Sequence, residues 1–217
     1  TEHKAILDTC RQLEREGFEV TYLDPLPNGL LDLDLLKSSI REDTILASFM
    51  HVNNETGIIQ PIEEICKVIE NNDCFFHVDG AQGFGKELDT LKNKRIDLIS
   101  ISGHKIYGPK GIGALITRLR NYNKPPLQPL FFGGGQESKL RPGTLPVHLI
   151  AGLGVAAKVA KRDLKKRQTK NKVIFNKIID LIKNLKGELN GDTKHLLGNC
   201  INFSIPGVDA EAFMLMT

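Results

Sequence analysis

The sequence has no tryptophan and only four cysteines, three methionines and three tyrosines among 217 residues. No cysteine stands in a Cys-x-x-Cys pair, which argues against both a disulfide framework and a zinc site. No apolar run is long enough to span a bilayer, and no signal peptide is recognisable. We therefore expect a soluble domain without a bound metal, in a reducing cytoplasm and away from membranes.

The net charge is only +3 at neutral pH, which implies no obligate polyanion partner. One basic tract runs from Lys158 to Lys172, with Val159, Ala160 and Leu164 at helical spacing. We predict a solvated helix face, and the alternative is a docking surface for an acidic partner or for nucleic acid. Direct nucleic-acid binding is not expected, because the tract lacks interleaved aromatic residues.

Strand-like and helix-like segments alternate along the chain. Helices are expected at 3–16, 32–40, 61–71 and 145–185, strands at 18–23, 44–51, 74–79, 96–102, 111–117 and 199–205, and a turn at 25–29. This alternation predicts an α/β fold with a mostly parallel central sheet covered by helices on both faces.

The length and a hydrophobic content of 41% allow one sizeable core and the beginning of a second lobe. We expect residues 1–145 to form a large domain that is incomplete at its N-terminus. Residues 146–217 should form a long connecting helix and the truncated start of a small C-terminal α/β domain. The chain therefore reads as an internal portion of a longer protein.

A single lysine follows the strand expected at 96–102. Ser102, Gly103 and His104 precede Lys105, and Gly108 and Pro109 then turn the backbone. A partly desolvated amine at a strand end can form a Schiff base with an aldehyde, as pyridoxal phosphate chemistry requires. The alternative is a solvated surface lysine.

An aspartate one strand earlier favours the chemical interpretation. Asp79 ends the apolar segment that begins at Cys74, and Gly80, Ala81 and Gln82 follow it. A carboxylate beside the pyridine nitrogen of pyridoxal phosphate keeps that nitrogen protonated. In parallel sheets, ligands bind beyond the carboxyl ends of strands, where Asp79 and Lys105 both fall.

At this point the chain resembles the class V, fold-type I pyridoxal phosphate enzymes, and among them the cysteine desulfurases of the IscS and NifS kind. The matching segments, in order along the chain, are Thr-Glu-His-Lys at 1–4, Glu-Gly-Phe-Glu-Val-Thr-Tyr at 16–22, His-Val-Asn-Asn-Glu-Thr-Gly at 51–57, His-Val-Asp-Gly-Ala-Gln at 77–82, Ser-Gly-His-Lys-Ile-Tyr-Gly-Pro-Lys-Gly at 102–111, Gly-Gly-Gly-Gln-Glu at 133–137 and Arg-Pro-Gly-Thr at 141–144. Several spaced motifs in one order are highly specific.

The resemblance implies a role for each of several side chains toward pyridoxal phosphate. By this resemblance, Lys105 binds the cofactor aldehyde and moves protons, Asp79 pairs with the ring nitrogen, and His3 stacks on the ring and acts in acid–base steps. Gln82 binds the phenolic oxygen, and Asn54 lies near the phenolic oxygen and the substrate carboxylate. Ser102 and His104 bind the phosphate, and Thr144 reaches the phosphate from a second subunit of a homodimer. Gly80 and Pro142 stand where relatives usually have Ala and Ser.

Simpler roles remain open for three of these features. His3 can be an exposed first-turn residue of a helix. Asn54 lies in a segment of turn composition, where its side chain can cap the backbone. The glycines at 133–135 lack the spacing of a phosphate-binding loop, so a flexible loop is the simpler interpretation.

The resemblance implies conversion of L-cysteine to L-alanine, with the sulfur passed as a persulfide to a sulfur-acceptor protein. Relatives serve iron–sulfur cluster assembly, tRNA thiolation and DNA sulfur modification. The nucleophilic cysteine of the family lies beyond Thr217, and Cys10, Cys66, Cys74 and Cys200 are expected to be small buried hydrophobic residues. The alternatives are another class V activity, such as an aminotransferase or a selenocysteine lyase, and a non-catalytic sulfur-transfer scaffold.

Overall fold

The computed structural model describes residues 1–120 and 122–216. Its elements, in chain order, are α1 (Lys4–Arg15), α2 (Leu33–Ser39), β1 (Leu46–Met50), α3 (Ile62–Val68), β2 (Phe75–Asp79), η1 (Thr90–Lys92), β3 (Leu98–Ser102), η2 (Gly103–Ile106), β4 (Gly113–Thr117), η3 (Gln136–Lys139), α4 (Val147–Asn184), β5 (Glu188–Leu189), β6 (Phe203–Ser204) and α5 (Ala210–Met216). The predicted alternation of helices and strands is thus confirmed for most of the chain.

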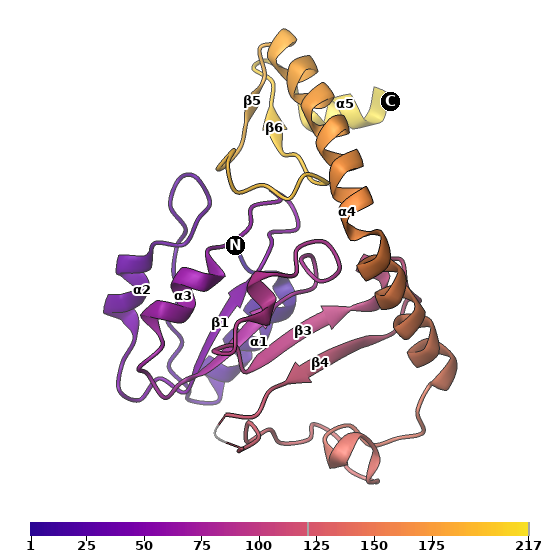
Figure 1. Cartoon of the computed structure of the whole chain (residues 1–217). Coiled ribbons are helices and arrows are strands. Elements are labelled where there is room, and N and C mark those ends of the chain that lie inside the picture. The colour runs from indigo at the N-terminus through magenta and orange to yellow at the C-terminus, as the bar shows by residue number, and fades with distance from the viewer. Residues whose placement is uncertain (121, 217) are drawn as a thin grey trace.

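The main sheet has four strands in the order β1-β2-β3-β4 (Figure 1). β1, β2 and β3 run parallel, and β4 pairs with β3 in the antiparallel sense. Only residues 103–112 join β3 to β4, and a parallel crossover needs a dozen residues or more. The prediction of a mostly parallel sheet is confirmed, with an antiparallel edge strand.

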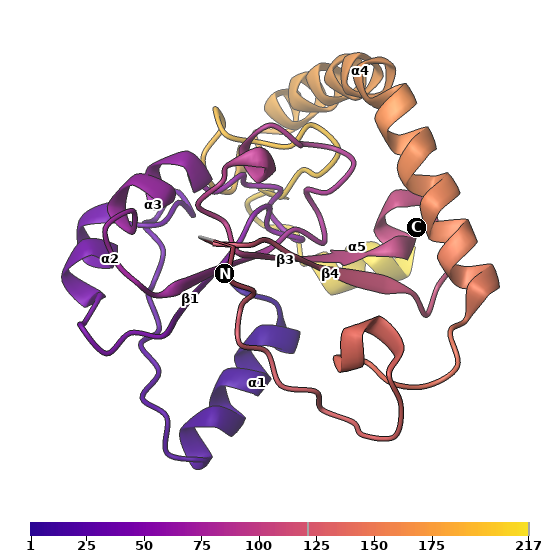
Figure 2. The same ribbon diagram turned by 60° about the horizontal axis from the view of Figure 1, so that its bottom comes forward.

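Helices lie on opposite sides of this sheet (Figure 2). α2 and α3 cover one face, where Phe76 and Val78 of β2 pack with Ile62, Ile65 and Leu36 in the main hydrophobic core. Burial of each such side chain contributes roughly 1.5–3 kcal/mol. Because side chains alternate along a strand, His77 and Asp79 belong to the other face, toward α1.

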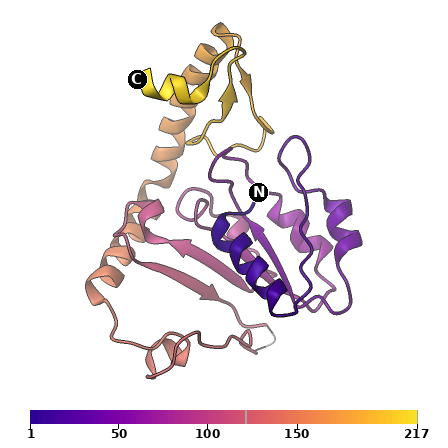
Figure 3. The ribbon, with the colours of Figure 1, turned by 180° about the vertical axis from the view of Figure 1, so that it is seen from behind.

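A stripe of small residues on α4 lets this helix pack closely on the loops that follow β2 and β3. A Cβ atom at Gly152 would lie 2.5 Å from Cγ of Pro109, and one at Gly85 would lie 3.1 Å from Cβ of Ala160. Ala156 and Ala160 are buried in a second cluster with Ile106. From this contact α4 runs away from the sheet toward β5 and β6 (Figure 3).

One predicted strand, at 18–23, is absent, and another, at 199–205, was predicted too long. Residues 18–23 form no strand, because they pair with no neighbour among the described residues, and Phe18 and Tyr22 are exposed. The strand expected at 199–205 is reduced to Phe203–Ser204, paired with β5. Cys200 precedes it in a turn, where its N–H donates to the carbonyl of Leu197 at 3.1 Å. Local preference for extended backbone does not make a strand without a hydrogen-bonded partner.

The cysteines divide into two pairs by burial. Cys66 and Cys74 are buried as expected, whereas Cys10 and Cys200 are only half-buried, and all four are free thiols. For Cys10 and Cys200 the prediction of full burial is wrong. Cys10 lies on α1 and Cys200 lies in the turn before β6, and the described residues cover each of these side chains only in part.

The basic tract lies on α4 and its lysines are exposed, so the predicted solvated helix face is confirmed. Arg167 is the exception, since its guanidinium lies 5.0 Å from the ring centre of Tyr107, a cation–π distance. Within residues 1–120 and 122–216, no helix combines the length and the apolar character needed to cross a membrane.

Candidate active site

The carboxyl ends of β2 and β3 bring the two predicted reacting groups to one edge of the sheet. Asp79 is the last residue of β2, and the parallel register pairs it with Ser100 of β3. β3 ends at Ser102, and η2, which follows directly, carries Lys105. The carboxylate and the amine therefore leave neighbouring parallel strands at the edge where ligands bind in open α/β sheets.

Asp79 is a buried carboxylate fixed by the surrounding backbone. Its Oδ1 accepts a hydrogen bond from the N–H of Ala81 at 2.9 Å, and its carbonyl oxygen accepts one from the N–H of His51 at 2.9 Å. A carboxylate held this way can stabilise a cationic ring nitrogen placed beside it.

Lys105 lies on the single turn of η2 and is half-buried. The turn closes at Tyr107, whose φ of 65° is in the left-handed region. Immediately before Lys105, Oγ of Ser102 and Nδ1 of His104 are 2.9 Å apart. One short segment thus presents an amine, a hydroxyl and an imidazole, which is a donor set suited to an aldehyde and a phosphate.

The start of α1 lies at the same edge of the sheet. His3 is the N-cap of α1, and its Nδ1 accepts a hydrogen bond from the N–H of Ala5 at 3.1 Å. The first-turn interpretation of His3 is therefore correct, and this bond also fixes the imidazole where α1 begins. Next to it, Oε1 of Glu2 accepts from the N–H of Met50, at the end of β1.

Glu2 is a half-buried residue whose carboxyl group is influenced by Asp79. Burial is the main cause that raises its pKa from 4.5 to about 7, and the Asp79 carboxylate adds to that effect, while the bond from Met50 opposes it. Oε2 of Glu2 is buried without a hydrogen-bond partner among the described residues. Between pH 4.5 and about 7, Glu2 therefore binds protons that an ordinary glutamate has lost.

His77 lies on the same face of β2 as Asp79, and it had no predicted role although the matching segment at 77–82 begins with it. Its ring nitrogens are 2.8 Å from Oγ of Ser48 on β1 and 2.8 Å from Oγ of Ser100 on β3. Burial lowers the pKa of His77, and Asp79 opposes that effect. Its spacing of two residues from Asp79 was the available signal, since it places both side chains on one face.

The side-chain capping expected at Asn54 is made by its neighbour. Oδ1 of Asn53 accepts hydrogen bonds from the N–H groups of Glu55 and Thr56 at 2.9 and 2.8 Å, and Nδ2 of Asn53 donates to the carbonyl of Thr1 at 2.9 Å. Asn53 thus ties the loop after β1 to the start of the chain. Asn54 is half-buried, and its predicted role beside a cofactor stays a prediction.

Two more predicted residues lie on loops. Oε1 of Gln82 accepts a hydrogen bond from Nζ of Lys86 at 3.0 Å. Thr144 is exposed in the loop that joins β4 to α4 (Figure 1). Its predicted role requires a second subunit and stays a prediction. The glycines at 133–135 lie in the same connection, as expected for a loop.

A cavity of about 930 Å³ lies beside η2, between α4 and the segment that precedes β6. Lys105 and Lys86 line it from the sheet side, and Arg167 lines it from α4. Its size is that of a small-molecule pocket. Asp79 and Gln82 do not line it in the described part of the chain, so this cavity does not contain the Asp79 carboxylate.

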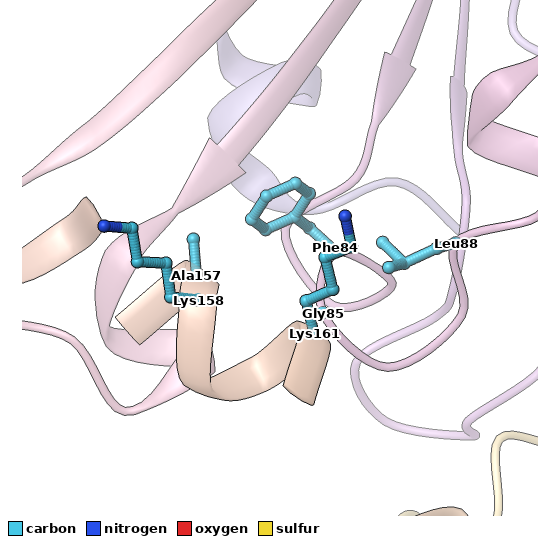
Figure 4. A pocket seen from close by; sticks show the side chains of 6 residues that line it. All are labelled: Phe84, Gly85, Leu88, Ala157, Lys158 and Lys161. Carbon is cyan, nitrogen blue, oxygen red and sulfur yellow. The ribbon is translucent and has the colours of Figure 1, made fainter. Parts of the chain in front are cut away.

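A smaller pocket of about 300 Å³ lies on the other side of the loop after β2. Phe84, Gly85 and Leu88 line it from the loop, and Ala157, Lys158 and Lys161 line it from α4 (Figure 4). None of the predicted site residues lines this pocket in the described residues.

The sequence profile of the aminotransferase class-V family matches residues 1–216. The chain belongs to this family. Two curated relatives are cysteine desulfurases IscS, from Ruthia magnifica subsp. Calyptogena magnifica at 48% identity and from Vibrio vulnificus at 46% identity, each over 99% of this chain. This class-V chain spans about half the length of these relatives, 53% in both cases.

Solved structures of class-V relatives share the fold. DndA from Streptomyces lividans is 45% identical with a TM-score of 0.93, over 99% of this chain and 60% of DndA. A NifS-like protein is 34% identical with a TM-score of 0.91, over 97% and 57% of the two chains. SspA in complex with cysteine is 40% identical with a TM-score of 0.82, over 100% and 60%.

Proposed function

We propose that this chain forms part of a pyridoxal phosphate-dependent cysteine desulfurase. One observation carries the proposal, namely that Asp79 and Lys105 leave neighbouring parallel strands at the edge where His3 begins α1. The similarity to IscS proteins and to SspA in complex with cysteine supports L-cysteine as the substrate.

The donor set fits pyridoxal phosphate group by group. The buried carboxylate of Asp79 suits a protonated pyridine nitrogen, and the amine of Lys105 suits the aldehyde. Ser102 and His104, 2.9 Å apart, offer hydrogen-bond donors to a phosphate. The imidazole of His3, fixed by the bond from Ala5, offers a flat surface for the ring.

When bound, pyridoxal phosphate supplies an electron sink for charge that develops on the substrate. The residues of this chain then bind and orient it and move protons. Asp79 holds positive charge on the ring nitrogen, and Gln82 and Asn54 bind oxygen atoms of the cofactor and substrate. Lys105 is the base that takes and returns the α-proton, and His3 assists in acid–base steps.

The overall reaction transfers one sulfur atom. The C–S bond of L-cysteine breaks and an S–S bond forms with an enzyme thiol, which becomes a persulfide. The cysteine Cβ gains a proton, and L-alanine leaves. A sulfur-acceptor protein would take the persulfide sulfur, and Thr144 would complete the phosphate site across a homodimer. A cytoplasmic location and the division into domains at 1–145 and 146–217 belong to the same proposal.

The test uses the full-length protein incubated with pyridoxal phosphate and L-cysteine. We expect persulfide and alanine in equal amounts and no amination of keto acids. We also expect Lys105→Ala to lose the visible absorption band of the bound cofactor and the mass increase after borohydride reduction. Amination in place of persulfide formation would assign another class V activity. An unchanged absorption band in Lys105→Ala would refute the assignment of Lys105.

A further inference from the structure

Lys86 makes a contact with a predicted site residue that the motifs did not indicate. Its Nζ donates a hydrogen bond to Oε1 of Gln82 at 3.0 Å, and both side chains are half-buried in the loop after β2. Lys86 and Lys105 line the same cavity. Lys86 therefore bonds to a residue expected to bind the cofactor and shares a cavity with the amine expected to react with it.

Close packing holds the backbone of Lys86 in place. Gly85, which precedes it, has a φ of +77°, and a Cβ there would lie 2.8 Å from Ile106 and 3.1 Å from Ala160. On the other side, Nε2 of Gln168 on α4 donates to the carbonyl of Lys86 at 3.0 Å. Both η2 and α4 thus fix the position from which the Lys86 side chain reaches Gln82.

The chemistry of the two side chains determines which end of the Gln82 amide faces Lys86. An ammonium group has three N–H donors and no acceptor, whereas a glutamine amide has an oxygen acceptor at one end and an NH₂ donor at the other. Only the oxygen of Gln82 can meet Lys86. The NH₂ group of Gln82 is then the end that remains for another acceptor.

Burial and two neighbouring groups change the pKa of Lys86. Burial lowers this pKa, Lys105 on η2 lowers it further, and Cys200 before β6 opposes both effects. The hydrogen bond to Gln82 is therefore made by an amine whose hydration is reduced, and such a bond is stronger than the same contact at the surface.

We propose that Lys86 is a positioning residue, which fixes the Gln82 amide with its NH₂ group toward the phenolic oxygen of the bound cofactor. This inference rests on the proposed function. Without Lys86 the amide can rotate, and its oxygen would then face an oxygen acceptor that it cannot bind. The donor of Gln82 to the phenolic oxygen would be lost for part of the time.

The test is a pH titration of the visible cofactor band in the full-length protein loaded with pyridoxal phosphate. We expect Lys86→Met to shift the midpoint upward by roughly half to one pH unit, because a net hydrogen bond changes a titration by about that much. Lys86→Arg is the matched control, since it keeps a charged group that only donates, and its midpoint should stay near that of the wild type.

The same titration in a Gln82→Ala protein separates an effect on the orientation of the Gln82 amide from a direct effect of the Lys86 charge. If Lys86 acts through Gln82, Lys86→Met causes no further shift in a Gln82→Ala protein. A shift of equal size in that background would overturn the proposal, and so would an unshifted midpoint in Lys86→Met alone. If Lys86→Met does not retain the cofactor, Lys86→Gln replaces it, because a glutamine meets either end of the Gln82 amide. A wild-type protein with no visible band would refute the proposed function itself.

Discussion

Two carboxyl groups, those of Glu2 and Asp79, share the buried edge of the sheet but are held differently. Asp79 accepts a backbone N–H bond from Ala81 at a strand end, whereas one oxygen of Glu2 has no partner among the described residues. Burial disfavours the charged form of Glu2 most, and the nearby Asp79 carboxylate adds to that effect. With a pKa of about 7, Glu2 is mainly protonated below neutral pH.

Glu2 makes stability depend on pH. Its pKa is about 7 in the folded chain against an ordinary value of 4.5. Between these values the folded state binds more protons than the unfolded state, so stability falls as pH rises through this window. We expect Glu2→Gln, which cannot ionise, to exceed the wild type in stability above pH 7, by roughly 1–3 kcal/mol.

Urea unfolding at pH 4.5 and pH 8 measures the effect of Glu2. Glu16→Gln, at an exposed glutamate at the other end of α1, is the control and should show no such dependence on pH. Equal effects of both substitutions at both pH values would contradict the assignment of the proton to Glu2.

Asp79 should matter for turnover more than for cofactor binding. We expect Asp79→Ala in the full-length protein to retain part of the cofactor, since other groups bind the aldehyde and the phosphate, but to lose alanine release almost completely. Absorption spectra and an alanine assay check the two outcomes separately. Near-normal alanine release by this variant would argue strongly against the electron-sink role of the Asp79 carboxylate.

The positions of Asp79 and Lys105 followed from the sequence, because each comes directly after a clear apolar strand. The hydrogen bonds of Asn53 and Lys86 did not follow, because they depend on how loops fold back on the sheet. A pair four residues apart, such as Gln82 and Lys86, gives no signal outside a helix. The close packing of Gly85 against Ile106 and Ala160 helps to hold the loop that makes this contact.

At the scale of elements, one buried acid joins the strands at the end opposite to the candidate site. Asp97, just before β3, accepts a hydrogen bond from the N–H of Phe76 at 2.7 Å and forms ion pairs with Arg95, at 3.0 Å, and with Arg120. The same arginines also donate to the carbonyl of Cys74 at the start of β2. This cluster fixes the register of β2, β3 and the chain beyond β4.

Removal of Asp97 leaves two guanidinium groups without their buried anion. We expect Asp97→Ala to lower the free energy of unfolding by about 3–5 kcal/mol, measured by urea denaturation. Asp89→Ala is the matched control, because its pair with Lys92 is exposed and such pairs contribute about 0–1 kcal/mol. A loss below 1 kcal/mol for Asp97→Ala would show that the cluster does not hold the strands.

Elements with a partner were predicted well and elements without one were not. The apolar runs that became β1, β2 and β3 each pair with at least one neighbouring strand, and α2 and α3 pack on one face of the sheet. The extended run at 18–23 has comparable composition but lies exposed. Whether an extended segment becomes a strand depends on a neighbouring edge, which composition does not reveal.

At the scale of the whole molecule, the buried side of α4 is built from alanine and glycine. Ala160 is almost fully buried and touches the site of Gly85. We expect Ala160→Phe to cost about 1–3 kcal/mol of stability through overpacking, and in the full-length protein to weaken cofactor retention, because it displaces the loop of Lys86. Val155→Phe, at an exposed position on the same helix, should change neither stability nor retention by comparison.

α4 has 38 residues and is therefore about 57 Å long at 1.5 Å per residue. It packs on η2 and on the loop after β2 from Gly152 to Gln168, and it carries β5 and β6 near its end (Figure 3). The chain between β5 and β6 is bonded back to the loop after β1, since the N–H of Ile59 donates to the carbonyl of His195 at 2.7 Å and the N–H of Leu197 donates to the carbonyl of Gly57 at 2.8 Å. The helix is therefore one side of a closed brace, and both ends of that brace rest on the loops that surround Lys105.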